Sequence, residues 1–263
     1  MIKEPYYTID FTAIDCKFEI LLNDIPIICL ETEGQMSPNV PLNFGIYNSG
    51  NQKLIINLFP LETELYLSPL SEFKYVIKLF DALGNNFHFI EDISSYVFEK
   101  ITDEEKKPKL SHSTEFSANV PFKIANLDKS KDLLTISDDK NYLNKTLNSA
   151  YNEILSLLKS KKYDLFYDKI KYRERNMAIS MYLNEEDVNA RINSLIEDIE
   201  SGFFVNELPI DRVLKIYGNG KLATFKKLNG EPALVLSNPK TNEETMIELM
   251  FHIPEGKTEF EII

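Results

Sequence analysis

The chain is poor in the residues from which reactive centres and metal sites are usually built. It has three histidines and two cysteines among 263 residues. His88, His112 and His252 stand far apart and fit no HExxH or other metal-ligand spacing, and neither cysteine has a second cysteine within such a spacing. GxSxG and Walker sequences are missing as well. We therefore expect no catalytic residues, no metal and no cofactor, and we predict that the protein is not an enzyme.

Long apolar runs are scarce. The longest, residues 18–30, is interrupted by Asn23 and Asp24 and is too short to span a membrane. The N-terminus carries Glu4 and Asp10, where a secretory signal peptide needs an uninterrupted apolar region. The sequence thus predicts a cytoplasmic protein with no membrane partner.

Positive charge is in deficit, because 41 acidic residues against 29 basic ones leave a net charge of −12. Proteins bind DNA and RNA non-specifically by neutralising phosphates with Lys and Arg. We therefore expect no nucleic-acid partner. An acidic surface suits a basic partner, or simply solubility.

The first half of the chain alternates short β-rich runs with turn residues and shows no sustained helical period. We predict an all-β domain over residues 1–126, and its six to eight expected strands favour a β-sandwich. The polar stretch 102–114 is expected to be an exposed loop within this domain.

The best-defined unit of this half is a hairpin with a two-residue turn at Asn23-Asp24. In that register Leu22 faces Ile25 and Phe18 faces Cys29, so that the apolar side chains share one face of the sheet.

The same register keeps the two cysteines apart. Cys16 then faces Glu31 and lies diagonal to Cys29, at roughly 7–8 Å, which is long for a disulfide. We predict two buried thiols, which agrees with a reducing compartment.

The second half has a different period. Residues 127–140 are mainly charged and polar, and we predict a linker there, followed by an α+β domain over 141–263. Apolar residues recur at helical spacing over 143–158 and 163–170. A third helix has the clearest signals, since Asn184 can cap its start and Gly202 can end it.

Gly218, Gly220 and Ala223 have the spacing of a dinucleotide-binding fingerprint, which works only when a helix follows the glycines. Here no helix follows. With tight turns at Asn219-Gly220 and Asn229-Gly230, three antiparallel strands share one apolar face. We therefore predict a meander sheet and no nucleotide.

Three helices followed by an antiparallel meander resemble, over roughly residues 141–263, the cone-shaped fold of the nuclear-transport-factor-like superfamily. The resemblance implies a fold and no particular activity. An enzyme on this fold needs polar groups among its helix-facing residues. The residues that we expect to face the helices are all apolar: Leu214, Ile216, Ala223, Phe225, Leu234, Leu236, Leu249 and Phe251. The sequence therefore predicts a packed core.

Residues 159–175 are basic and tyrosine-rich within this acidic chain. Tyr172, Arg173 and Arg175, which we place at the end of a helix, are our candidates for partner binding, because aromatic and Arg side chains are favoured anchors in interfaces. The other interpretation is an amphipathic helix with cations near its negative C-terminus.

The runs NDIPI (23–27) and PLNFGIYNSGNQKLIINLFP (41–60) are similar to the β-sandwich part of uncharacterised two-domain proteins of Gram-negative bacteria. Some of those resemble immunity proteins of contact-dependent or type VI toxin systems. The resemblance implies a cytoplasmic protein that neutralises a toxin by binding it. The alternative is a small-molecule-binding or hydrolytic cone-fold domain with an accessory β-sandwich, which a deep pocket with converging polar side chains would favour.

Overall fold

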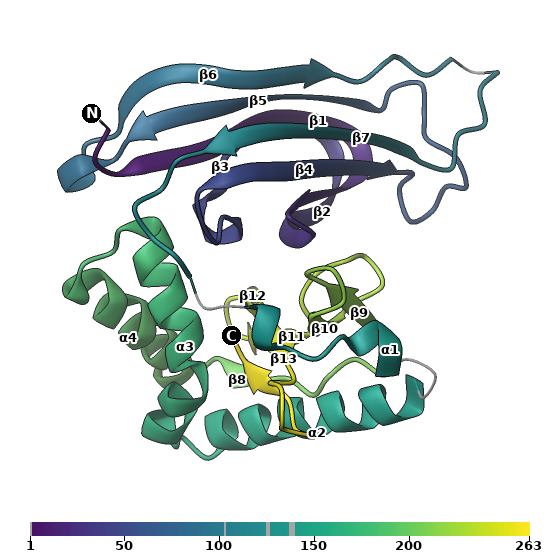
Figure 1. Cartoon of the computed structure of the whole chain (residues 1–263). Helices are drawn as coiled ribbons and strands as arrows, with labels where there is room; N and C mark the ends of the chain where they lie inside the picture. The colour runs from purple at the N-terminus through teal and green to yellow at the C-terminus, as the bar shows by residue number, and fades with distance from the viewer. Residues whose placement is uncertain (1, 103, 125–126, 137–139) are drawn as a thin grey trace. The chain divides into compact units, whose positions relative to one another are not determined.

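The computed structural model of the chain describes residues 2–102, 104–124, 127–136 and 140–263. These residues form two compact units: the first extends to Ile124 and also includes Ser180–Tyr182, and the second contains the remainder. The protein is an α+β protein with a large curled antiparallel sheet, a region of helices and several short strands (Figure 1).

The first unit is built on one antiparallel sheet of seven strands, in which β1 is the central element. Its order is β6-β5-β1-β4-β7, with β2 and β3 also paired to β1. The elements are β1 (Pro5–Leu22), β2 (Ile25–Met36), β3 (Asn39–Pro41), η1 (Asn43–Gly45), β4 (Gly50–Phe59), β5 (Glu72–Asp81), η2 (Leu83–Asn85), β6 (His88–Val97) and β7 (Leu110–Ala118). The all-β prediction is confirmed for this half, but its strands join in one sheet where we expected the two separate sheets of a sandwich.

The curl of this sheet follows from the length of β1. Residues 5–14 of β1 pair with β5, whereas residues 17–22 pair with β4. Phe11 and Phe18, one from each part of β1, meet with their ring centroids 5.1 Å apart, and Phe73 of β5 lies 5.4 and 5.5 Å from the two rings. All three rings are buried in the core of the first unit. An aromatic contact within one strand thus closes the curl.

The predicted turn at Asn23-Asp24 is confirmed, because both residues have positive φ and Leu22 pairs with Ile25. The register that we predicted for the rest of the hairpin is wrong. Pro26 has no N–H to give to β1, and a bulge follows, so that Cys29 lies opposite Glu19 instead of Phe18.

Neither cysteine forms a disulfide. Cys16 lies opposite Thr32 and not Glu31, because the bulge between Ile20 and Leu21 shifts the register by one residue. Burial raises the pKa of the Cys16 thiol to about 12, whereas Cys29 is only half-buried. The prediction of two unbridged thiols is confirmed, but only Cys16 is fully buried.

The polar stretch 102–114 is not a loop throughout, since residues 110–114 belong to β7 and pair with β4. Residue 103 lies outside the described residues. As an edge strand, β7 has side chains that are alternately exposed and covered, which explains why its sequence is polar.

The rest of the chain begins with helices and ends in two small sheets, ordered β14-β13-β10-β9 and β12-β11-β8. The elements are η3 (Leu127–Lys129), α1 (Leu133–Ile136), α2 (Lys140–Lys159), α3 (Tyr163–Met181), α4 (Glu185–Ser201), β8 (Phe204–Val205), β9 (Val213–Tyr217), β10 (Leu222–Lys226), β11 (Leu234–Asn238), β12 (Glu243–Ile247), β13 (Phe251–His252) and β14 (Glu261–Ile262).

Part of the segment that we assigned to a linker is packed. Leu133 is fully buried in the core of the second unit. The backbone N–H of Lys131 donates to the carbonyl of Ile253, and that of Leu133 donates to Gly220. Residues 137–139 lie outside the described residues. Residues 127–136 are thus held to the later strands by backbone hydrogen bonds, which the polar composition of the segment did not indicate.

The predicted boundaries of α4 are confirmed. Asn184 and Asp187 form a capping box, in which each side chain accepts a hydrogen bond from the other residue's backbone N–H, at 2.9 and 3.2 Å. Gly202 ends the helix with φ +116°.

We expect the substitution Asn184→Ala to lower the free energy of unfolding by about 1 kcal/mol, because it leaves an N–H of the first turn without its acceptor. Urea titration followed by far-ultraviolet circular dichroism measures the change. Asn193→Ala, at an exposed site inside the same helix, is the control. Asn193→Ala should not lower the free energy of unfolding, because alanine is a better helix former than asparagine.

The first hairpin of the meander has the predicted register, with Leu214 opposite Phe225 and Ile216 opposite Ala223. The second does not. After Asn229-Gly230 the returning strand is joined to β10 by a short contact, a bridge between Lys226 and Pro232 and a hydrogen bond from the Ala233 N–H to the Phe225 carbonyl.

Beyond that bridge the second edge of β10 is taken by β13 through Ala223 and Phe251, and β11 pairs instead with β12 and β8. All the predicted core residues still reach one apolar cluster, with Leu214 and Ile216 only partly buried. The predicted residues therefore do form an apolar core, although the sheet that carries it is divided and a pocket lined partly by Leu249 opens beside it.

Candidate functional site

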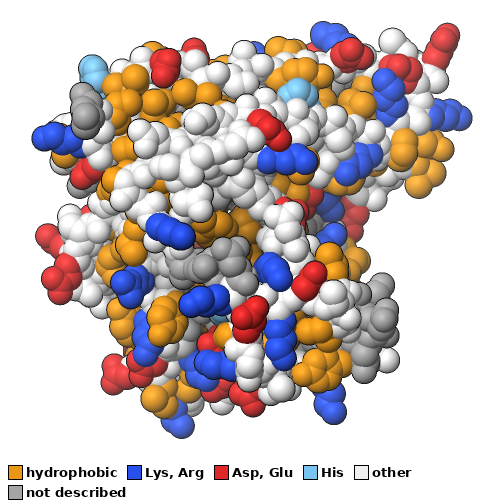
Figure 2. Space-filling view, viewed as in Figure 1, with side chains coloured by type: hydrophobic (Ala, Val, Ile, Leu, Met, Phe, Trp, Pro, Cys, Tyr) orange, Lys and Arg blue, Asp and Glu red, His pale blue; other side chains and the backbone are white. Residues whose placement is uncertain are grey.

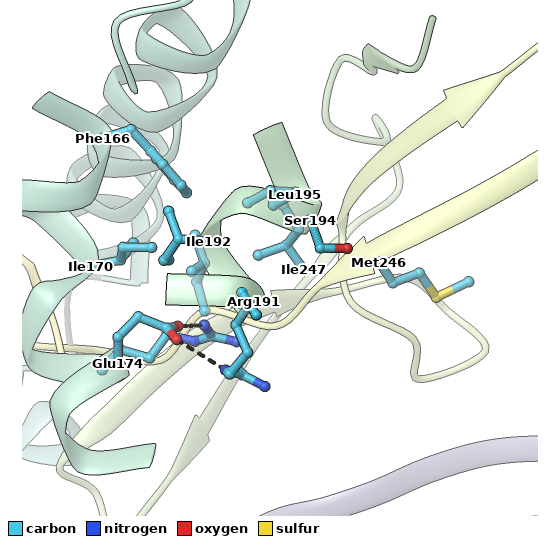
Figure 3. Close-up of a pocket in the computed structure, with 12 residues that line it drawn as sticks. Phe166, Ile170, Glu174, Arg191, Ile192, Ser194, Leu195, Met246 and Ile247 are labelled. Atoms are coloured by element: carbon cyan, nitrogen blue, oxygen red, sulfur yellow. Dashed lines mark hydrogen bonds and ion pairs between the residues drawn. The ribbon is translucent and has the colours of Figure 1, made fainter. Parts of the chain in front are cut away.

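A pocket of about 490 Å³ opens in the second unit between α3, α4 and residues 246–249 (Figure 3). Its size is typical of small-molecule sites, which occupy roughly 300–1,000 Å³. Charged side chains lie at one end and apolar ones at the other. The apolar part is formed mainly by Phe166, Ile170, Ile192, Leu195, Met246 and Leu249.

Helical periodicity explains how these groups reach one place. Phe166, Ile170 and Glu174 follow one another at intervals of four on α3, so that Glu174 continues the apolar stripe of the helix. Arg191 and Leu195 have the same spacing on α4. Each helix therefore contributes both a charged and an apolar group to the pocket.

The charged end is an ion cluster centred on Glu174, whose side chain is only 3% exposed. Arg173 donates from Nη1 to one carboxylate oxygen, and Arg191 donates from Nε to the other at 3.2 Å. Burial lowers the pKa of Arg173, and the neighbouring Glu174 carboxylate opposes that shift. Both oxygens of Glu174 are thus occupied by guanidinium groups that stay protonated.

A second buried polar group lies on β10. Lys226, whose side chain is 4% exposed, pairs with Glu248, which also accepts from Thr224 at 3.1 Å. The hydroxyl groups of Thr224 and Tyr151 are 2.9 Å apart. Burial raises the pKa of Tyr151, which keeps it neutral. Both faces of β10 are therefore buried: Ala223 and Phe225 lie on one face, and Leu222 lies on the other with the paired Thr224 and Lys226.

This arrangement is suited to binding. A general base must be able to approach its substrate, but each oxygen of Glu174 already accepts from a guanidinium group, and the carboxylate is almost fully buried. The only other ionisable groups that line the pocket in the described part of the chain are Arg173 and Arg191.

Ser130 and His252 form a pair that resembles part of a hydrolase triad, with Oγ and Nδ1 2.7 Å apart. Ser130, however, is 1% exposed, so a substrate carbonyl has no path to its hydroxyl. The carbonyl of Ser130 accepts from Lys221 at 3.0 Å. Glu261, opposite His252 in the ladder, pairs with Lys257. These bonds fix the loop before α1 against β13.

The three histidines lie in three different environments. His112 stacks on Tyr96 with the ring centroids 3.5 Å apart, and burial lowers the pKa of His112. His88 is exposed on β6. Within the described residues no cluster of His, Cys, Asp and Glu could hold a metal ion. The same part of the chain contains no helix with the length and apolar character needed to cross a membrane.

Comparison of the chain with protein families, with curated proteins and with solved structures finds no match.

The structure does not bring Tyr172, Arg173 and Arg175 to one site. Arg173 lines the pocket, whereas Tyr172 is 55% exposed in a groove beside α2, and Arg175 is exposed. Our placement of the three at a helix end is wrong, because α3 continues to Met181. Successive residues of a helix point about 100° apart, which separates the three side chains.

An exposed apolar surface lies at the free edge of the first unit's sheet, where β6 is the last strand. Phe87 and Phe89 are 56% and 48% exposed, and Leu83 and Ile90, which are close to them in the sequence, are also exposed. We call these four residues the β6 patch. Figure 2 shows hydrophobic side chains gathered over the part of the molecule that Figure 1 labels β5 and β6.

The two phenylalanines of the β6 patch lie side by side. Phe87 packs edge-on against Tyr6 at 4.9 Å, and Phe89 packs edge-on against Phe80 at 5.7 Å. Tyr6 and Phe80 are direct partners in the ladder between β1 and β5. The exposed rings of Phe87 and Phe89 therefore each pack on one of two paired residues, Tyr6 and Phe80.

Proposed function

We propose that the protein is a non-enzymatic binding protein whose partner is another protein, most concretely a bacterial toxin that it neutralises by direct, cytoplasmic binding. We also propose that the two compact units are two domains, a sandwich-like first domain and an α+β second domain. The observation that carries the proposal is the β6 patch.

Exposed aromatic side chains at a free strand edge suit protein recognition for two reasons. Aromatic residues are enriched among the anchors of interfaces. An edge strand also offers unpaired backbone groups to an incoming chain. Burial of apolar area contributes about 25 cal/mol per Å², so two half-exposed phenylalanines hold substantial unused binding energy.

Charge supports the same proposal. Glu91 and Asp92 follow the patch directly and are exposed, in a chain with a net charge of −12. Opposite charges across an interface speed association and exclude wrong partners. A partner with basic residues around an apolar centre therefore fits this surface best.

The apolar interior of the second unit and the paired state of Glu174 support binding over hydrolysis. A hydrolytic site needs a base or nucleophile that can reach substrate. Among the described residues, the serine that pairs with a histidine is buried and the pocket's carboxylate is held by two guanidinium groups.

We expect the protein to co-purify in a stoichiometric complex with the product of the neighbouring gene, and the substitutions Phe87→Ser and Phe89→Ser together to weaken that complex at least tenfold. Titration calorimetry with both purified proteins measures the affinity. Ile210→Ser is the matched control, because Ile210 is an apolar residue 99% exposed in the other unit. Failure to form a complex contradicts the proposal, as does equal weakening by the control.

A further inference from the structure

The pocket between α3 and α4 carries an unbalanced positive charge. Its charged lining consists of two arginines and one glutamate. The neighbouring Lys226 and Glu248 neutralise each other and add nothing to this balance. A pocket with a surplus cation at one end recognises an anion.

Arg191 is the cation available to a ligand. Its side chain is 40% exposed, whereas that of Arg173 is mostly buried. Arg191 bonds to Glu174 through Nε, and within the described residues its two terminal nitrogens have no recorded partner. Those nitrogens form a planar fork that fits the two oxygens of a carboxylate.

The other end of the pocket is apolar. Phe166 and Ile170 of α3 and Leu249 are almost fully buried, whereas Leu195 and Met246 are more exposed. A polar or doubly charged ligand would lose its hydration against these walls without compensation. An aliphatic chain gains free energy there.

From these two ends we infer that the pocket binds an amphipathic monocarboxylate, with the carboxylate on the terminal nitrogens of Arg191 and the aliphatic chain between α3, α4 and Leu249. This goes beyond the proposed protein partner, which concerns the β6 patch of the other unit. No covalent step is involved, and Glu174 holds the guanidinium of Arg191 in position.

The test uses sodium decanoate as the probe, kept below the concentration at which it forms micelles, and titration calorimetry on the full chain. Decylamine, with the same chain and the opposite charge, is the matched ligand. We expect decanoate to bind and decylamine to bind at least tenfold more weakly. Equal binding of the two would overturn the inference, because it would show that the charge of Arg191 plays no part.

Two variants locate the site. Arg191→Gln should weaken decanoate binding at least tenfold, because it removes both charge-assisted hydrogen bonds to the carboxylate. Ser194→Trp, at an exposed position of the pocket lining, should fill the pocket and abolish binding. Arg175→Gln, on the same helix as Arg173 but outside the pocket, should leave the affinity unchanged. Unaltered circular dichroism shows that each variant is folded. If decanoate binds the Ser194→Trp variant as tightly as it binds the wild type, its site lies elsewhere on the protein. That result would contradict the inference.

Discussion

The substitution Glu174→Ala is expected to lower the free energy of unfolding by about 3–5 kcal/mol, the range found when one partner of a buried ion pair is removed. Glu174 forms the ion pair with Arg173, Glu248 attracts the same guanidinium more weakly, and that guanidinium is largely withdrawn from water. Without it, Arg173 remains charged and is left buried and unpaired. Urea titration of the variant and the wild type measures the loss.

Two further variants separate this mechanism from a general intolerance of α3 and α4. Glu197→Ala removes an exposed carboxylate from α4 and should change the free energy of unfolding by less than about 0.5 kcal/mol. The double substitution Arg173→Met and Glu174→Met removes both buried charges and should recover most of the loss. A double variant no more stable than Glu174→Ala alone would show that shape, and not the unpaired charge, determines the cost.

Phe73→Ala is expected to lower the free energy of unfolding of the first unit by about 3–5 kcal/mol, as is usual when a buried aromatic ring is deleted. Phe73 touches three other rings, those of Phe11, Phe18 and Phe98. The deletion leaves a cavity where the two parts of β1 meet, so we expect the curl of the sheet to loosen. Thermal and urea unfolding followed by near-ultraviolet circular dichroism measure the effect.

Phe89→Ala is the matched control for that substitution, because it deletes the same side chain from an exposed site of the same sheet. It should lower the free energy of unfolding by about 1 kcal/mol, because it loses one edge-on contact from a half-exposed ring, while weakening the protein complex. If Phe73→Ala cost no more stability than Phe89→Ala, the aromatic contact would not hold the curl.

Local signals predicted the parts of the fold whose cause is local. Asn184 and Gly202 mark the ends of α4 by the hydrogen bond and the backbone angle that each residue type supplies. The turn at Asn219-Gly220 likewise sets the register of β9 and β10, because a turn of fixed length allows one alignment.

The errors arose where a distant partner decides the outcome. β10 pairs with β13 rather than β11, and nothing within the turn at Asn229-Gly230 indicates that β13 competes for the same edge. The residues of β7 appear polar because an edge strand exposes one face, and its partner β4 lies more than fifty residues earlier. Pro26 was the one local warning of the bulge between β1 and β2.

The ion cluster of the pocket could be predicted only in part. Glu174 occupies the next position of the apolar stripe that runs through Phe166 and Ile170, which is a signal for a buried and therefore paired carboxylate. Arg173, beside Glu174, was predicted to be a binding residue, but for the wrong reason, because we placed it at the end of a helix. Arg191 comes from another helix, and nothing in the sequence around it distinguishes it from an ordinary exposed helical arginine.

The central claim is that the protein acts by binding and not by catalysis, and a titration of the neighbouring gene's product with the protein tests it most directly. Residual toxic activity is measured as the protein is added in steps. We predict a linear loss that ends when one molecule has been added per toxin, with activity restored when the complex is dissociated. Complete and lasting neutralisation by a small fraction of an equivalent would contradict the account, because only a catalyst can turn over.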